Sequence, residues 1–240
     1  MAKRKRGSNQ FNTPLGRSYS NILPSLPTQF SAPLLASATR KSLPEREALF
    51  HAGDVADGCY RLEQGLLKVS IASPLGDERI LTILGPGSIV GELAMIDGLP
   101  RSATVVAIRD CELSFISRKA FAHCVKEHPE IHQYLVATLV SRLREADGAL
   151  AAASFLTVKA RVARAMLELA HHLGRETETG RIMILHKIRQ GDLAAMAGVA
   201  RENVSRTMSE WKRQGLIGQS SSYYFINDRK KLLSETEESL

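Results

Sequence analysis

The spacing of apolar residues changes its period along the chain, and the first patterned part is typical of β-strands. Between residues 43 and 116 the apolar positions form short runs that end in Gly, Pro or Asp turns. Three such stretches are CYRLEQGLLKVSIAS, ERILTILGPGSIVGEL and SATVVAIRDCELSFIS. Short strands at close intervals, broken by turns of this kind, predict an antiparallel roll or sandwich.

From about residue 130 the period becomes helical, and no proline or turn pair interrupts it before residue 155. A heptad seam of apolar and small residues predicts one helix of about seven turns. A long helix with so narrow an apolar stripe needs a partner. A second copy of the chain is the simplest one, and packing on its own domain is the alternative. The seam consists of Ile131, Leu135, Leu139, Leu143, Ala146, Leu150 and Ala153.

A third pattern, from about residue 158 to residue 228, combines short amphipathic helices with a hairpin. VKARVARAMLELAHHLG predicts one helix, and RQGDLAAMAGVARENVSRTMSEWKRQGLI predicts two more that are broken at Gly198. A Gly-containing turn between two short helices is typical of a helix-turn-helix. The LIGQSSSYYFIND stretch that follows predicts a hairpin wing.

The helix after Gly198 begins with a polar face that suits base recognition. Side chains at the N-terminal end of a recognition helix contact base edges, where arginine reads guanine and glutamate accepts from cytosine. Arg189 and Gln190, ahead of the first helix, can reach phosphates. The alternative is a solvated, charged helix face. The candidate base-reading residues are Arg201, Glu202, Asn203, Ser205 and Arg206.

These patterns predict an α+β protein with five parts. We expect a basic tail over 1–30, a β-roll domain over 31–127, a long helix over 128–156, a winged helix-turn-helix over 157–228 and a C-terminal tail over 229–240. The basic tail either attracts DNA without sequence preference or is simply solvated. Its charge cluster is Lys3, Arg4, Lys5 and Arg6.

Composition narrows the functional class. The formal net charge of +7 over 240 residues favours an anionic partner. Three widely spaced cysteines fit a reducing cytoplasm better than disulfides or a zinc site. No apolar run is long enough to cross a membrane. The sequence shows no nucleophile–base grouping, metal-ligand spacing or P-loop, so we do not expect an enzyme.

One short segment, GELAMIDGLPRSATVVA, carries two opposite charges among small and apolar residues. Glu92 and Arg101 could pair with each other. They could instead bind a ligand that has both a hydroxyl group and an anionic group, because a carboxylate accepts from hydroxyls and a guanidinium donates to anions.

This segment and the second helix of the pair together carry a family resemblance. GELAMIDGLPRSA resembles the phosphate-binding cassette, and ARENVSR the recognition helix, of the bacterial cyclic-AMP receptor protein (Crp/Fnr) family of transcription regulators. HAGDVADGCYRLEQGLLKV resembles the first strands of the family's roll, and the similarity extends over about residues 40–228. It implies a homodimer that binds inverted-repeat half-sites in double-stranded DNA and contacts RNA polymerase.

The resemblance also implies a role for each cassette residue. Glu92 would accept the ribose 2′-hydroxyl of a cyclic nucleotide, and Arg101, helped by Ser102, would pair with the cyclic phosphate. Gly91 would let the backbone approach the sugar, and a helical turn from Leu93 would direct free amides at the anion. Cyclic AMP or cyclic GMP is thus the expected allosteric ligand. The alternative is a regulator of the same fold with a vestigial pocket or another small-molecule signal.

Other sensing modes of the family fit less well. An iron–sulfur sensor would need a cysteine cluster, usually near the N-terminus, and no cysteine precedes Cys59. His51 and His123 could be proposed as haem ligands, but a lone histidine is more often a surface or core residue. A cyclic-nucleotide module of a channel or kinase would lack the helix-turn-helix behind the long helix.

Two positions depart from the resembled pattern on the long helix. Aligned on Phe155-Leu156, Ala146 and Asp147 stand where the cyclic-AMP receptor contacts adenine, Asp147 reaching across from the partner subunit. An ionised aspartate only accepts, and guanine presents N1–H and its N2 amino group side by side. Our hypothesis is that Asp147 narrows or reverses the preference for adenine. The alternative is a solvated charge on the helix surface.

The recognition helix has features of two kinds of family member. Arg201, Glu202 and Arg206 resemble the recognition residues of the cyclic-AMP receptor, which is similar to a reader of TGTGA half-sites. Ser205 instead resembles the recognition helix of the fumarate–nitrate regulator, whose half-site is TTGAT. We expect a half-site closer to TGTGA, because Arg201 can bind the additional guanine. Ala200 offers no hydroxyl at the helix N-cap, which predicts a weaker phosphate contact.

Overall fold

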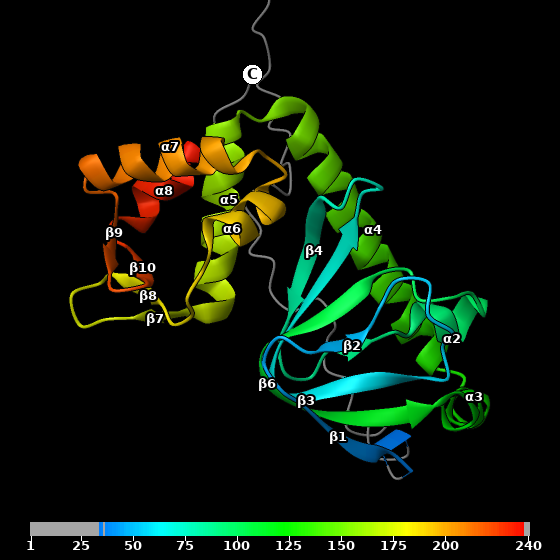
Figure 1. The fold of residues 1–240 in the computed structure, drawn as a ribbon. Helices are drawn as coiled ribbons and strands as arrows, with labels where there is room; N and C mark the ends of the chain where they lie inside the picture. The colour runs from blue at the N-terminus through cyan, green and yellow to red at the C-terminus, as the bar shows by residue number, and fades with distance from the viewer. Residues whose placement is uncertain (1–33, 36, 238–240) are drawn as a thin grey trace, which may run out of the picture.

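The computed structural model of the protein describes residues 34–35 and 37–237. The basic tail expected over 1–30, with its cluster Lys3, Arg4, Lys5 and Arg6, lies outside the described residues. The described chain forms two domains, with a long helix running along the first and leading into the second (Figure 1).

The first domain is an antiparallel sheet in which β3 and β6 are long central strands paired along most of their length. The sheet order is β1-β6-β3-β4, with β2 added to β6 and β5 added to β3. Side chains of β6 that alternate inward, such as Val105, Ala107 and Leu113, fill the core of the roll. The strands are β1 (Thr39–Leu43), β2 (Ala48–Phe50), β3 (Gly58–Ala72), β4 (Glu78–Leu84), β5 (Ile89–Val90) and β6 (Thr104–Ser117).

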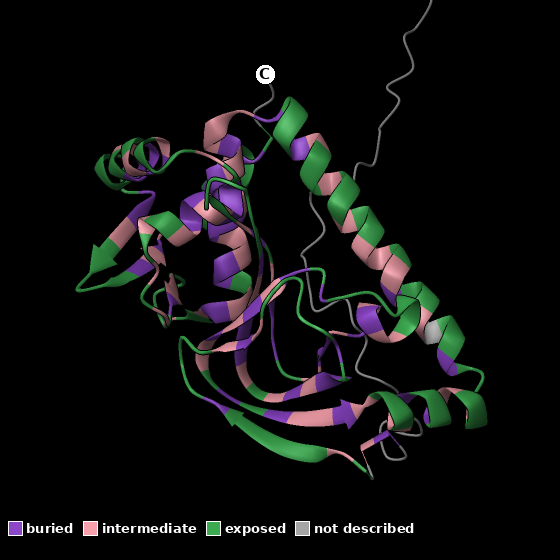
Figure 2. Cartoon of the chain, turned by 45° about the vertical axis from the view of Figure 1, so that its right-hand side comes forward, coloured by how far each residue is buried: buried purple, intermediate pink, exposed green. Residues whose placement is uncertain are grey.

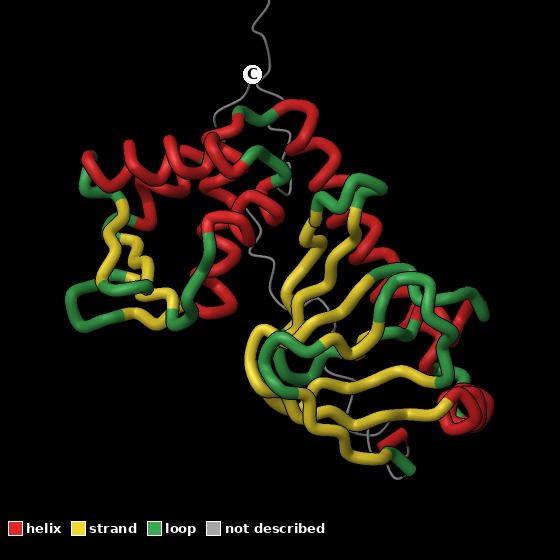
Figure 3. The backbone as a smooth tube through the Cα atoms, viewed as in Figure 1, coloured by secondary structure: helices red, strands yellow, loops and turns green. Residues whose placement is uncertain are grey.

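Three helices adjoin the roll. The short helix α2 (Leu93–Asp97) follows β5 and begins where the sequence predicted a helical turn. Helix α3 (Arg118–Glu127) starts at Ser117, whose hydroxyl accepts from the Ala120 amide at 3.2 Å. It leads into α4 (Ile131–Phe155), which runs the height of the molecule beside the roll (Figures 1 and 3).

The two sides of α4 differ, and the predicted heptad seam is only partly correct. Ile131 is 4% exposed and packs in the core of its own domain, with Leu135 against it, because the start of α4 lies on α3. Further along, Val136, Val140, Leu143 and Leu150 are 58%, 42%, 62% and 69% exposed. Mainly exposed and half-buried residues therefore follow the helix in Figure 2. Of the predicted seam, Leu143 and Leu150 lie on this exposed stripe, and the small residues Ala146 and Ala153 are exposed as well.

The second domain contains the predicted helix-turn-helix and wing. Helix α5 (Val158–Leu173) is capped by the Thr157 hydroxyl, and α6 (Gln190–Ala197) and α7 (Arg201–Arg213) are separated by a turn at Gly198. Gly198 has a φ of 64°, which favours glycine. A four-stranded antiparallel sheet in the order β7-β8-β10-β9 completes the domain. Its strands are β7 (Gly174–Glu176), β8 (Ile182–Ile184), β9 (Ile217–Ser220) and β10 (Tyr223–Ile226).

The C-terminal tail expected over 229–240 begins instead as a helix. Helix α8 (Arg229–Glu235) starts at Asp228, whose side chain accepts from the Lys231 amide at 2.9 Å, and it packs against α5. Leu232 is fully buried in the core of the second domain. One buried leucine and a cap thus fix a segment whose polar sequence gave little helical signal.

Strand β4 of the first domain shares the hydrophobic core of the second domain, while the rest of the roll keeps a core of its own. Ile80 and Ile83 of β4 are at most 5% exposed and belong to the same cluster as Met196 and Ala197 of α6. In the part of the chain that the structure describes, no helix combines the length and apolarity needed to cross a bilayer.

Candidate functional site

A cavity of about 370 Å³ lies between the roll, the inner face of α4 and the second domain. Outside α4, two parts of its lining carry charged side chains. The "cassette end" consists of Gly91, Glu92, Leu93, Arg101 and Ser102, so every cassette residue predicted from the sequence lines the cavity. The "interdomain end" consists of Arg79, Arg161, Arg164, Glu168 and His172.

Arg101 is the fixed cation of the cassette end. Its side chain is 5% exposed, and its two terminal nitrogens donate to the carbonyl oxygens of Gly91 at 2.9 Å and Gly58 at 2.7 Å. The guanidinium also lies over the Phe50 ring, 4.2 Å from its centroid. Asp57, 3.8 Å away, is a weak and exposed countercharge. The positive charge is therefore held in place largely by neutral groups, which leaves it able to attract an anion.

Gly91 makes this arrangement possible. Its φ of +83° favours glycine, and a Cβ at this position would collide with the Arg101 guanidinium. The backbone then turns into α2, whose first residue, Leu93, lines the cavity. Ser102 is exposed beside Arg101, so its hydroxyl is open to a ligand.

Glu92 does not pair with Arg101, which was the alternative that the sequence left open. It forms an ion pair with Arg142, which reaches the cassette from α4. Glu92 is 2% exposed, and neither carboxylate oxygen has a hydrogen-bond partner of good geometry among the described residues. Arg142 therefore compensates the charge, while the oxygens keep their capacity to accept hydrogen bonds.

Burial controls the proton affinity of the cassette. Removal from water raises the pKa of the Glu92 carboxyl above its ordinary value, and this effect exceeds the opposing influence of Arg142 and Arg101. Burial next to Glu92 also raises the pKa of the Cys59 thiol to about 12, so this cysteine stays protonated and unreactive.

Sequence reasoning placed Ala146 of α4 at the ligand but missed other residues of this helix that line the cavity. Thr138, Arg142, Glu145 and Ala149 follow one another at steps of four, three and four residues and all line the cavity. Thr138 is 2% exposed, and its hydroxyl has no hydrogen-bond partner in the described structure. The available signal was a second, polar heptad stripe beside the apolar one.

Asp147 and Ala146 lie differently on α4. Ala146 lines the cavity of its own chain, whereas Asp147 is exposed and does not. Asp147 instead stands on the exposed apolar stripe of the helix, four residues after Leu143 and three before Leu150. Within one chain, then, Asp147 is not a cavity residue.

The interdomain end is a cluster of opposite charges. Burial raises the pKa of the Glu168 carboxyl to about 7, with Glu145 acting in the same direction and Arg164 and Arg79 opposing it. One turn along α5, burial lowers the pKa of His172 to about 4. Glu168 thus titrates near neutrality, and His172 is neutral there. The described residues include no group of three or more His, Cys, Asp or Glu side chains placed to bind a metal ion.

The predicted DNA-contacting residues gather at the start of the second helix of the pair. Arg201, Glu202 and Arg206 are exposed on the first turns of α7, while Asn203 and Ser205 are half-buried. Arg206 donates to the Asn203 amide oxygen at 2.8 Å, which orients its guanidinium. Helix α7 has no side-chain cap at Ala200. Arg189 is the exposed N-cap of α6, and Gln190, expected ahead of that helix, is its first residue.

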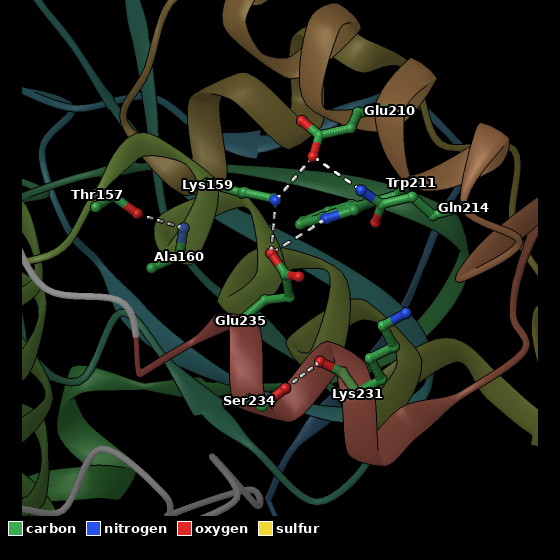
Figure 4. A network of polar contacts seen from close by, with 9 residues as sticks. All are labelled: Thr157, Lys159, Ala160, Glu210, Trp211, Gln214, Lys231, Ser234 and Glu235. Atoms are coloured by element: carbon green, nitrogen blue, oxygen red, sulfur yellow. Dashed lines mark hydrogen bonds and ion pairs between the residues drawn. The ribbon is translucent and has the colours of Figure 1, made fainter.

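A polar network behind α7 holds this helix in place (Figure 4). The buried Trp211 donates its indole N–H to Glu235 of α8 at 3.4 Å. Lys159 of α5 contacts both Glu235 at 3.1 Å and Glu210 of α7 at 2.9 Å. These carboxylates raise the pKa of Lys159. Because α8 was not predicted, neither was this support for α7.

Comparison with known families matches both domains in order. Residues 40–128 match the cyclic nucleotide-binding domain, and residues 160–235 match the Crp-like helix-turn-helix domain. The second match includes α8.

Relatives of known role are similar over most of the chain. A CRP-like cAMP-activated global transcriptional regulator from Mycobacterium tuberculosis is 30% identical over 189 residues, which cover 79% of this chain and 84% of the relative. The cyclic AMP receptor protein of Thermus thermophilus is 35% identical over 179 residues, covering 74% and 79% of the two chains. The first of these relatives is named as a transcriptional regulator and the second as a receptor for cyclic AMP.

A solved structure has the same arrangement of domains. A transcriptional regulator of the CRP/FNR family from Thermus thermophilus superimposes with a TM-score of 0.71 at 26% identity, covering 83% of this chain and 99% of that one. The fold, the two domain families and the level of identity agree, and the chain belongs to the Crp/Fnr family of transcription regulators, with a cyclic nucleotide-binding domain and a helix-turn-helix DNA-binding domain.

Proposed function

We propose that this regulator is a non-enzymatic homodimer whose affinity for specific DNA is controlled by cyclic AMP or cyclic GMP bound in the cavity. The observation that carries the proposal is the separation of Glu92 and Arg101. Each is buried at the cassette end and contacts other groups, so the two do not form an ion pair with each other. A vestigial cassette would have no reason to keep both.

The chemistry of the cassette end suits a cyclic phosphodiester with a ribose. Arg101 presents its guanidinium, together with the Ser102 hydroxyl, to a single negative charge. The Glu92 oxygens can accept the 2′-hydroxyl, and the Thr138 hydroxyl stands ready for a further hydrogen bond. Leaving a buried acceptor without a hydrogen-bond donor costs free energy, so these groups favour a polar ligand.

The exposed stripe of α4 supports the homodimer. Val136, Val140, Leu143 and Leu150 follow one side of the helix at coiled-coil spacing and are at least 42% exposed. The same stripe on a second copy would cover them, as in a two-stranded coiled coil. Asp147 lies within this stripe. In such a dimer it would face the partner subunit and reach the purine bound in the partner's cavity.

For DNA we propose that α7 enters the major groove, with Arg201, Glu202 and Arg206 reading base edges of an inverted repeat. Half-sites close to TGTGA, about one helical turn apart, are expected. Arg189 would contact phosphate from the N-terminus of α6. As proposed for the family, the DNA-bound dimer would contact RNA polymerase, and the site of action would be the cytoplasm.

A titration tests the ligand. Purified protein is mixed with cyclic AMP or cyclic GMP in a calorimeter, and the same concentrations are used while binding to a labelled DNA site is followed by fluorescence anisotropy. We expect saturable binding of at least one nucleotide and a rise in DNA affinity at matching concentrations. If neither nucleotide binds, the alternative is correct: a regulator of the same fold with a vestigial pocket or another small-molecule signal.

A selection experiment tests the DNA target. Random duplexes recovered with the wild-type protein should converge on an inverted repeat, and sedimentation should give twice the chain mass of 26.3 kDa. Replacing Arg201 by Val should relax discrimination at one base pair per half-site by about 1–3 kcal/mol. Recovery of single, unpaired half-sites would contradict the dimer.

A further inference from the structure

Strand β4 belongs to the ligand domain but contacts the helix-turn-helix directly. Its residues Ile80, Ile83 and Leu84 line the cavity. Ile80 and Ile83 also lie in the same hydrophobic cluster as Met196 and Ala197 of α6. One strand therefore faces both the nucleotide cavity and the first helix of the DNA-binding pair.

Arg79, at the start of this strand, makes the polar part of that contact. Its guanidinium donates to the carbonyl oxygen of Ala195 at 3.4 Å, near the C-terminal end of α6. The last carbonyls of a helix have no partner within the helix, and the helix dipole makes this end negative. A cationic side chain from another domain can donate to these carbonyls and also offset the negative end of the helix dipole, so the position suits arginine.

The contact extends to the turn of the helix-turn-helix. A Cβ on Gly198 would collide with the Arg79 guanidinium, so the two are in close contact. Arg161 of α5 donates to the Gly198 carbonyl at 3.1 Å from the second domain's own side. The segment that leads into α7 is thus held between one arginine of each domain, and Glu168 supplies negative charge nearby.

We propose that Arg79 is a positioning residue that couples the nucleotide cavity to the helix-turn-helix. A ligand that moves β4 would move the end of α6 through Arg79, and with it the start of α7. This inference rests on the proposed function for the identity of the signal. The docking of Arg79 on α6 does not, and it can be measured without nucleotide or DNA.

The test compares wild type with Arg79→Ala, Arg79→Lys and a matched control, Arg40→Ala, in which an exposed arginine on β1 of the same domain is removed. For each protein the ratio of DNA affinities with and without saturating cyclic nucleotide is measured by anisotropy. At 3.4 Å the Arg79–Ala195 hydrogen bond is long, so its loss should have the effect of a typical net hydrogen bond, a change of about five- to tenfold. We expect the ratio to fall by about this factor in Arg79→Ala, partly recover in Arg79→Lys and stay unchanged in Arg40→Ala.

Hydrogen exchange provides the second measurement. Amides of the 190–200 segment should exchange faster in Arg79→Ala than in wild type or Arg40→Ala, with no ligand present. A coupling ratio within twofold of wild type, or unchanged exchange in this segment, overturns the proposal. If the wild type itself does not respond to any nucleotide, the proposed signal is wrong, and hydrogen exchange alone decides whether Arg79 holds α6.

Discussion

The two charged ends of the cavity are built in opposite ways. At the cassette end, five residues within twelve positions of the sequence surround one site, and their charges are kept apart for a ligand. At the interdomain end, Arg79, Arg161 and Glu168 come from β4 and α5, and Arg161 and Glu168 lie close enough to Arg79 to influence its pKa. At the cassette end the Glu92 oxygens remain able to accept from a ligand, whereas at the interdomain end Arg79 and Arg161 donate to carbonyl oxygens of the protein itself.

This difference predicts that the ends respond differently to the same substitution. Arg101→Ala removes the fixed countercharge of the phosphate, a charge-assisted contact of roughly 1.5–3 kcal/mol, so nucleotide affinity should fall about tenfold to a hundredfold. Arg161→Ala, at the interdomain end, should leave affinity within about twofold. Calorimetry on both variants, with circular dichroism to verify folding, separates the two ends. Equal losses of nucleotide affinity in the two variants would show that the two ends do not differ in their contact with the ligand.

Arg142 sharpens the comparison at the cassette end. Arg142→Ala leaves Glu92 buried without its countercharge, which should cost roughly 2 kcal/mol of unfolding free energy at pH 7, because protonation limits the penalty for a buried carboxylate. Glu92→Gln in the same chain should restore most of this loss. Urea unfolding of the two single variants and the double variant measures the coupling. Additive losses would show that the pair contributes nothing.

The interdomain end should be the more sensitive to pH. Glu168, with a folded pKa of about 7 against an ordinary 4.5, binds its extra proton in the folded chain, so its contribution to stability falls as pH rises through that window. His172, with a folded pKa of about 4 against 6.5, binds its extra proton in the unfolded chain, so its contribution falls as pH drops through that window.

The two opposing slopes overlap between pH 4.5 and 6.5 and should largely cancel in the wild type. Glu168→Gln should expose the slope of His172, so acidification from pH 7 to pH 5 destabilises this variant. In His172→Gln only the slope of Glu168 remains, so the same acidification should raise the free energy of unfolding by roughly 1 kcal/mol. Urea unfolding at both pH values tests the signs. If the free energy of unfolding changed with pH in the same direction in both variants, the opposing slopes assigned to Glu168 and His172 would be wrong.

The smallest expected effect concerns Asp147, which is at neither end within its own chain. Asp147→Ser should shift the ratio of cyclic-GMP to cyclic-AMP affinity towards cyclic AMP by about fivefold, the size of one net hydrogen bond. Competition calorimetry with both nucleotides measures it, and Glu127→Ser in α3 serves as a charge-matched control. A ratio within twofold of wild type would leave Asp147 as a surface charge.

The sequence predicted the cassette end because its residues are local. Gly91 to Ser102 form one motif, and the structure needed only to bring Glu92 and Arg101 to the same cavity. It did not predict Arg142, which lies forty-one residues after Arg101, because an arginine in a helix gives no sign of which domain it will face. Arg79 was missed for the same reason, since its partner is a backbone carbonyl of another domain.

The helices show the same limit. The heptad pattern of α4 indicated its length, but assigned Ile131 and Leu135 to a partner when they pack on α3. Helix α8 was mistaken for a tail because its stability comes from Leu232 in the shared core and Glu235 under Trp211. Tertiary packing, more than local propensity, decides such short segments.

One helix, α4, has its polar stripe on the cavity and its apolar stripe on the outside, and in the proposed dimer this makes two equilibria inseparable. Any nucleotide that binds more tightly when α4 is paired must strengthen pairing by the same factor. Its apparent affinity then depends on the concentration of the protein itself. The cell could therefore set the threshold of the response through the abundance of the regulator as well as through the level of the nucleotide.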